Sequence, residues 1–152
     1  MGENFQEMSR EQVRNLLKHV DSKMDENVKK DVFTRLGHEC FYSRHLDQWI
    51  DQFKGDVQNL LHYVNVEKKS KYWESLALSP DKKRIVLTGK EVEGCACAFA
   101  DCADPPTSLC RHCCKNFQQE MFGSLLKKKV KVTITESLLL ADKRCSTIIE
   151  LP

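Results

Sequence analysis

Apolar residues recur at three- and four-residue spacing through the first part of the chain, which is the period of an amphipathic α-helix. The apolar positions fall into successive groups: Val13, Leu16, Leu17 and Val20; Val28, Val32, Phe33 and Leu36; Leu46, Trp49, Ile50 and Phe53; and Val57, Leu60, Leu61 and Val64. Each group follows residues that can cap a helix, namely Ser9 (with Gln12 as in a capping box), Asp25 or Glu26, Ser43 and Asp56. The pattern predicts a helical half over residues 1–68.

The period changes after about Ser70, and alternation typical of strands takes over. The expected elements are two strands at 72–78 and 84–88, a helix from Thr107 or Ser108 to about Leu126, and two strands at 130–138 and 145–151. The turns between paired strands are expected at 79–82 and 141–143. We therefore predict one α+β domain over residues 1–152, in which N-terminal helices precede a β-β-α-β-β unit (72–152) with an antiparallel sheet.

The helix expected at 107–126 has two distinct faces. Its apolar stripe consists of Cys110, Cys113, Cys114, Phe117, Met121 and Leu125. The opposite face consists of Arg111, His112, Lys115, Gln118 and Gln119. The stripe is expected to pack inward and the polar face to point outward.

Six of the eight cysteines lie between Cys95 and Cys114. Cys95 and Cys97 form one closely spaced pair after a strand, and Cys110 and Cys113 form another at the start of a helix. Two such pairs can supply the four thiolates of a tetrahedral zinc site. We predict zinc bound by these four residues, with Cys102 and Cys114 in reserve as ligands and an iron–sulfur cluster as the alternative cofactor.

Two other interpretations of the cysteines stay open. The thiols could form a metal-free reactive site, or some could pack as small apolar residues, above all Cys40, Cys114 and Cys145. Several thiolates packed together repel one another, so without a cation most must be protonated. This electrostatic conflict favours a bound metal ion.

Glu136 is the one candidate catalytic residue. By strand alternation it falls on the same face as apolar residues. Burial would raise the pKa of its carboxyl group and suit it to general acid or base catalysis. The alternative is that the end of the strand leaves Glu136 in solvent or paired with a basic residue.

Composition narrows the class of protein. Apolar residues make up 41% of the 152 residues and charged residues 30%, and the net charge is +2, which offers no electrostatic basis for binding nucleic acid. No apolar stretch approaches the ~20 residues of a membrane span. The first residues lack the layout of a signal peptide, so we expect a cytoplasmic protein whose thiols stay reduced.

The cysteine motifs also resemble a known group of domains. The motifs are Gly37-x-x-Cys40, Cys95-x-Cys97, Leu109-Cys110-x-x-Cys113, Val130-x-Val132-x-x-x-Glu136-Ser137 and Asp142-x-x-Cys145-x-x-Ile148. Mainly over residues 72–152, and more weakly over residues 32–45, the chain resembles domains related to the 4-vinyl reductase domain and L-2-amino-thiazoline-4-carboxylic acid hydrolase-like proteins. The resemblance implies an α+β domain that binds small ligands, sometimes as a sensor and sometimes with zinc. It also implies that the four proposed ligands lie at the mouth of a pocket and Cys145 on the last strand.

Together these observations predict a zinc-binding, cysteine-rich domain that binds or senses a small molecule, with no nucleic-acid or membrane partner and with homodimerisation possible. One alternative is a hydrolase of a small thiazoline-like or amide substrate, in which a metal-bound water or a thiolate attacks and Glu136 moves the proton. The other is an interaction module whose metal is purely structural.

Overall fold

The computed structural model describes residues 9–152. The expectation of a cytoplasmic protein used the first residues of the chain, and residues 1–8 lie outside the described part. Its helical half contains α1 (Arg10–Lys23), α2 (Glu26–Tyr42), α3 (Leu46–Asp51), α4 (Val57–His62) and a π-helical turn η1 (Tyr63–Glu67). Its second half contains β1 (Trp73–Leu78), β2 (Arg84–Gly89), η2 (Ala98–Ala100), η3 (Leu109–Cys114), α5 (Lys115–Leu126), β3 (Lys131–Glu136), η4 (Leu138–Leu140) and β4 (Ser146–Glu150). The predicted α+β class, with helices first and an antiparallel sheet after them, is confirmed.

The helix starts follow the predicted caps at α1, α2 and α4 but not at α3 or η3, where the side chain of Ser108 makes no capping hydrogen bond. Ser9 and Gln12 form the capping box of α1, and the side chains of Asp25 and Asp56 accept hydrogen bonds from backbone N–H groups in the first turns of α2 and α4. Ser43, however, does not cap α3. Its backbone N–H donates to the carbonyl of Glu39 at 2.9 Å, so it ends α2 instead.

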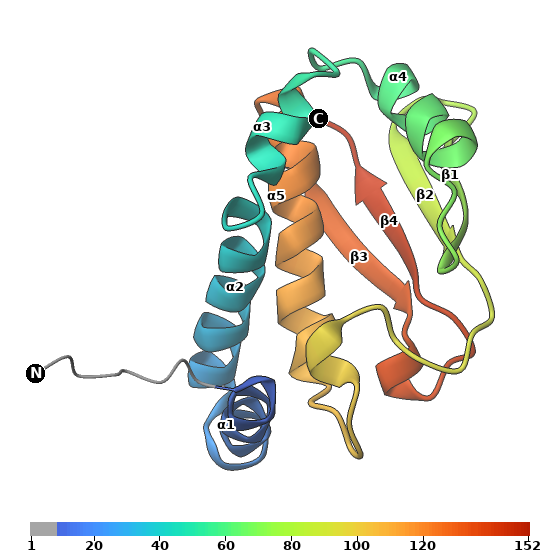
Figure 1. Ribbon diagram of the computed structural model, residues 1–152. Helices are drawn as coiled ribbons and strands as arrows, with labels where there is room; N and C mark the ends of the chain where they lie inside the picture. The colour runs from blue at the N-terminus through green and yellow to red at the C-terminus, as the bar shows by residue number, and fades with distance from the viewer. Residues whose placement is uncertain (1–8) are drawn as a thin grey trace, which may run out of the picture.

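The four strands are arranged in the order β1-β2-β4-β3, and every neighbouring pair is antiparallel. α5 connects β2 to the far edge strand β3, and β4 then returns between them. The last connection is longer than the three-residue turn that we predicted, because it also contains η4. In Figure 1, α5 lies against one face of the sheet and α2 lies on the far side of α5.

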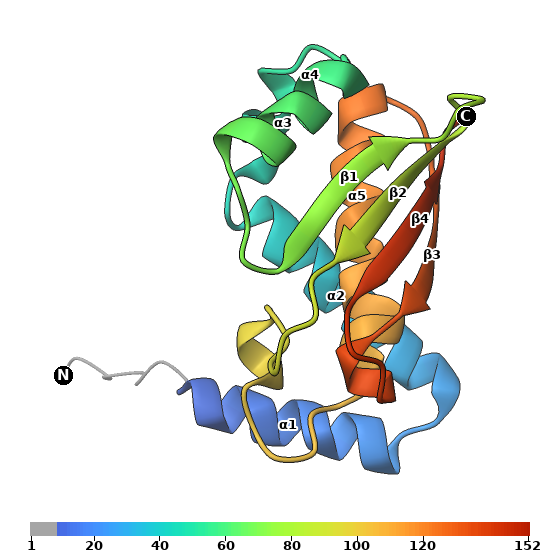
Figure 2. The same cartoon turned by 90° about the vertical axis from the view of Figure 1, so that its right-hand side faces the viewer.

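The main core lies between the sheet and these helices. Its fully buried side chains include Phe41 on α2, Phe122 on α5, Ile85 on β2 and Ile149 on β4. A smaller cluster, which includes Leu17, Phe33 and Leu109, joins α1 and α2 to η3. α1 crosses the end of the molecule where the 90–102 loop, η3 and η4 also lie (Figure 2). The core therefore holds α2, η3 and the sheet in fixed relative positions.

The π-helical segment η3, which directly precedes α5, places side chains of the 107–126 helix on faces other than those we predicted. η3 is π-helical, with wider turns than an α-helix, so residues before and after Lys115 do not follow one 3.6-residue pattern. Gln118, which we expected to face outward, is buried, and its Oε1 accepts a hydrogen bond from the Thr147 hydroxyl at 2.8 Å. Cys114, which we expected to face inward with the apolar stripe, is exposed.

None of the helices among residues 9–152 combines the length and the apolar character required to cross a lipid bilayer.

Candidate functional site

Seven of the eight cysteines gather around η3, which packs against α2 and lies near the loop after β2 and the segment before β4. We call this group the cysteine cluster: Cys40 on α2, Cys95 and Cys97 in the loop, Cys110, Cys113 and Cys114 on η3, and Cys145 just before β4. All of them are free thiols, and the pKa of each is shifted by the charge of, or a hydrogen bond with, another cysteine of the group. In Figure 1 and Figure 2, η3, the loop after β2 and the segment before β4 lie near the end of α5 that follows η3, and α2 runs beside α5.

Cys40 and Cys113 form the first thiol pair. Gly37, three residues before Cys40, lies directly against the backbone of η3. A Cβ atom added at Gly37 would overlap the carbonyl oxygen of Cys113 and would lie 3.1 Å from its carbonyl carbon. The glycine thus lets α2 approach η3 closely enough for the two sulfur atoms to interact.

The contact shifts the pKa values of the two thiols in opposite directions. A hydrogen bond from the Cys113 thiol lowers the pKa of Cys40 to about 6, and the nearby charge of Arg44 acts in the same direction. The same hydrogen bond, together with burial, raises the pKa of Cys113. Cys113 is only 6% exposed, whereas Cys40 is half-buried, so the thiol that ionises more easily is also the more accessible one.

Cys95 and Cys145 form the second pair, and again a glycine permits the approach. A Cβ atom at Gly89, the last residue of β2, would overlap the carbonyl oxygen of Cys145 and lie 3.0 Å from its backbone nitrogen. A hydrogen bond from the Cys95 thiol lowers the pKa of Cys145, and the same bond raises the pKa of Cys95. Each of the two thiol pairs therefore joins segments far apart in sequence across a glycine contact.

The remaining members of the cluster favour the protonated state. Burial is the main cause that raises the pKa values of Cys97 and Cys110. Cys114 is exposed to solvent, yet the surrounding protein atoms and the charges of Cys110, Cys95 and Cys97 raise its pKa to about 12. Its sulfur accepts a hydrogen bond from Gln118 Nε2 at 3.5 Å.

The thiol pairs differ from those that sequence spacing indicated. The Cys95 thiol pairs with the Cys145 thiol, although it also accepts a hydrogen bond from the backbone N–H of Cys97. The Cys113 thiol pairs with the Cys40 thiol. Across residues 9–152, no set of three or more His, Cys, Asp or Glu side chains is arranged so that it could hold a metal ion. The four proposed ligands Cys95, Cys97, Cys110 and Cys113 do lie in the same cluster, and zinc binding by them stays a prediction.

Sequence reasoning missed Cys40 and Cys145 as members of the site, since both were assigned to packing. No local spacing links them to their partners. The only available signals were two glycines, one in Gly37-x-x-Cys40 and one at the end of the β2 segment.

Cys102 and Glu136 occupy separate surroundings. The Cys102 thiol donates a long hydrogen bond to the Phe99 carbonyl, at 3.8 Å. Glu136 is half-buried, follows an irregularity in β3 after Ile134, and accepts a hydrogen bond from the Ser146 hydroxyl at 2.7 Å. This bond places Glu136 beside the residue that follows Cys145, and its catalytic role stays a prediction.

An open groove of about 700 Å³ adjoins the cluster. Cys95, Cys97 and Cys102 line it together with Lys71 and Tyr72, and Glu93 and Asp101 add carboxylates. The groove therefore combines thiols with side chains of both charges. Its volume is in the range of small-molecule sites.

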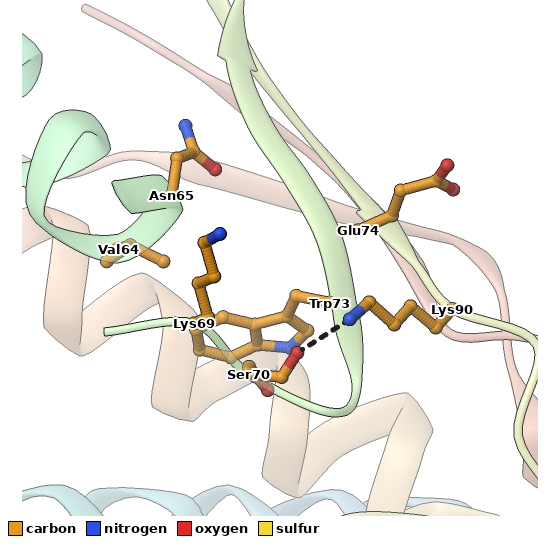
Figure 3. Close-up of a pocket in the computed structure, with 7 residues that line it drawn as sticks. All are labelled: Val64, Asn65, Lys69, Ser70, Trp73, Glu74 and Lys90. Carbon is orange, nitrogen blue, oxygen red and sulfur yellow. Dashed lines mark hydrogen bonds between the residues drawn. The ribbon is translucent and has the colours of Figure 1, made fainter. Parts of the chain in front are cut away.

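A smaller cavity of about 130 Å³ is lined in part by residues of the 69–74 segment (Figure 3). The Trp73 ring and the amino groups of Lys69 and Lys90 line it, and Lys90 Nζ donates to the Ser70 carbonyl at 3.1 Å. It contains no thiol, and its volume is well below that of most ligand sites. We therefore place the candidate site at the cysteine cluster and its groove.

The low pKa of Cys40 predicts that this thiol is alkylated at lower pH than an ordinary cysteine. Only thiolates react readily with iodoacetamide, so the rate at Cys40 should rise through a midpoint near pH 6, whereas Cys97 and Cys110 should react only at far higher pH. Peptide mass spectrometry after short exposures at a series of pH values measures the rate at each cysteine. In Cys113→Ala, which lacks the donating thiol, the Cys40 midpoint should move up towards that of an ordinary cysteine. A Cys40 midpoint near pH 9 in the unmodified protein would contradict this assignment.

No protein-family model matches the chain, and no curated protein matches it. The resemblance to the 4-vinyl reductase-related and hydrolase-like domains accordingly stays a prediction.

Proposed function

We propose that the cysteine cluster binds a soft metal ion, with zinc as the expected ion, and that this site serves to bind or sense a small molecule in the adjoining groove. The observation that carries the proposal is the convergence of seven cysteines from segments far apart in sequence. Packing alone does not require cysteine at these positions, because alanine, serine or valine could fill similar volumes. Thiolate ligands are what zinc and iron–sulfur clusters require of a protein.

The electrostatics of the cluster support a cation. Burial and neighbouring sulfur atoms raise the pKa values of Cys97, Cys110 and Cys114, because additional negative charge there is unfavourable. A divalent cation removes this conflict and replaces the thiol protons. Metal binding should therefore strengthen as pH rises, since each ligand must lose a proton before it coordinates.

The contact between Cys95 and Cys145 is the most suitable starting point for coordination. Two sulfur atoms already meet there, and the charges of Cys95 and Cys145 interact with that of Cys110. Cys97 lies two residues from Cys95 in the same loop. We infer that these four thiols supply the ligands after side-chain rotation, and that Cys113 remains with Cys40.

The groove provides the place for a small molecule. Cys95 and Cys97 belong both to the cluster and to the groove wall, so a ligand in the groove would lie beside the ion. Lys71 could pair with a carboxylate or other anionic group of that ligand, and Tyr72 offers an aromatic surface. A small anionic molecule with a soft donor atom fits these features best.

Cobalt(II) is a suitable probe for the proposed site, because thiolate coordination gives it strong charge-transfer absorption. Titration of the reduced protein without oxygen should produce these bands, and zinc should then abolish them. Cys145→Ser should weaken cobalt binding by about 100-fold or more, because even supporting residues around metal sites contribute 10–100-fold.

Cys102→Ser is the matched control, because Cys102 lies on the groove wall outside the thiol pairs and should keep affinity close to that of the unmodified protein. Circular dichroism confirms that both variants are folded. Absence of sulfur-to-cobalt bands, or equal affinity in the two variants, would contradict the proposal.

A further inference from the structure

We propose that Cys40 and Cys113 form a redox-active dithiol that reduces low-molecular-weight disulfides and closes as an intramolecular disulfide. This activity is separate from metal binding, because it uses the thiol pair between α2 and η3 and not the pair between Cys95 and Cys145. It requires only the two thiols and a disulfide co-substrate.

The contact between α2 and η3 is what makes the pair suitable. Gly37 brings the backbone of α2 against that of Cys113, and an added Cβ would also lie 3.2 Å from the backbone nitrogen of Phe117. Asn116 reinforces this contact, since its side chain donates to the carbonyl of Thr34 on α2 at 3.0 Å. The helical segments that carry the two thiols are therefore held together by backbone packing and not by a flexible loop, and the two thiols are close enough to share a hydrogen bond.

The solvent exposure of the two thiols decides which one attacks the small disulfide and which one closes the protein disulfide. Cys40 is half-buried and can be reached from solvent, whereas Cys113 is 6% exposed and lies behind it. Cys40 is therefore the attacking thiol and Cys113 the resolving thiol. The exposed Arg44 places a positive charge near Cys40. The nearby Glu39 carboxylate is paired with Arg35 at 2.9 Å. The positive charge of Arg44 therefore favours disulfides that carry carboxylates, such as glutathione disulfide.

The exchange balances in two steps. The Cys40 thiolate attacks one sulfur of the disulfide R–S–S–R, the S–S bond breaks, and one thiolate RS⁻ leaves while Cys40 remains joined to the other half. The Cys113 thiol then gives up its proton, its sulfur attacks the Cys40 sulfur, and the second RS⁻ leaves. The two protons from the protein thiols end on the two RSH molecules. The protein dithiol has lost two electrons and the small disulfide has gained them.

The test uses the reduced chain of residues 1–152 and glutathione disulfide without oxygen. Remaining thiols are blocked by alkylation, and mass spectrometry maps the disulfide-linked peptides with time. The expected first product is the Cys40–Cys113 disulfide. In Cys113→Ser the reaction should stop at Cys40 joined to glutathione, and in Cys40→Ser the rate of glutathione release should fall at least tenfold.

Cys102→Ser again serves as the matched control and should behave like the unmodified protein. The mapping in the unmodified chain decides the question even where a variant fails to fold. The proposal is overturned if Cys40 and Cys113 both remain open to alkylation while other cysteines pair first. It is also overturned if Cys113→Ser folds but accumulates no glutathione adduct at Cys40. Neither result depends on whether the protein binds metal.

Discussion

Replacement of Gly37 by alanine is expected to lower the free energy of unfolding by about 2–4 kcal/mol. The added methyl group would overlap the carbonyl oxygen of Cys113 and crowd the backbone nitrogen of Phe117. These are backbone atoms of η3 and α5, so they cannot turn aside as a flexible side chain can. Alanine in the interior of a helix is normally better than glycine by about 1 kcal/mol, and the collision must exceed that gain.

Gly94→Ala is the control, because an added Cβ there would meet no atom of residues 9–152 within 4 Å. Urea unfolding followed by circular dichroism should show a clearly lower midpoint for Gly37→Ala and little change for Gly94→Ala. Gly37→Ala should also slow closure of the Cys40–Cys113 disulfide, because α2 must move away from η3. Equal stability of the two variants would show that α2 and η3 do not approach as closely as described.

Replacement of Phe122 by alanine is expected to lower the free energy of unfolding by about 3–5 kcal/mol. Phe122 is fully buried on α5 and belongs to the core shared with Phe41 of α2 and Ile149 of β4. Truncation removes the apolar contacts of the ring and leaves a cavity that helices and sheet held by many other contacts cannot fill. Phe122→Leu keeps most of the apolar volume and should lose about 1.5 kcal/mol or less.

Thermal and urea unfolding of both Phe122 variants measure these differences. The prediction distinguishes a core that closes around α5 from a loose association of helices and sheet. A loss below about 1 kcal/mol in Phe122→Ala would indicate that α5 does not occupy the centre of the packed core.

Most secondary-structure elements could be predicted because their causes are local. Ser9, Asp25 and Asp56 cap helices through backbone groups a few residues away, and these bonds are visible in the spacing of the residues. The strands could be predicted from alternation in the same way. The prediction that Ser43 caps α3 was wrong, because one more backbone hydrogen bond extends α2 as far as Ser43. Where a helix ends depends on packing as well as on the capping residue.

The site was only partly predictable because its decisive contacts are not local. Spacing drew attention to the segment from Cys95 to Cys114, but it suggested partners two or three residues apart. The thiol pairs depend instead on how α2 lies against η3 and how β2 lies against the start of β4, where Gly37 and Gly89 remove a Cβ from each contact. The π-helical form of η3 also changes which side chains of 110–114 share a face, and no residue pattern indicated it.

The central claim is that the cysteine cluster is a metal site, and the metal content of the native protein tests it most directly. The chain of residues 1–152 should be purified under reducing, oxygen-free conditions without added metal, and its metal content should be measured by elemental analysis. We predict zinc in an amount equal to that of the protein, with clear loss in Cys145→Ser and retention in Cys102→Ser. Iron and sulfide in place of zinc would identify the cofactor as an iron–sulfur cluster. Metal-free protein that also fails to take up zinc would contradict the claim that the cluster is a metal site.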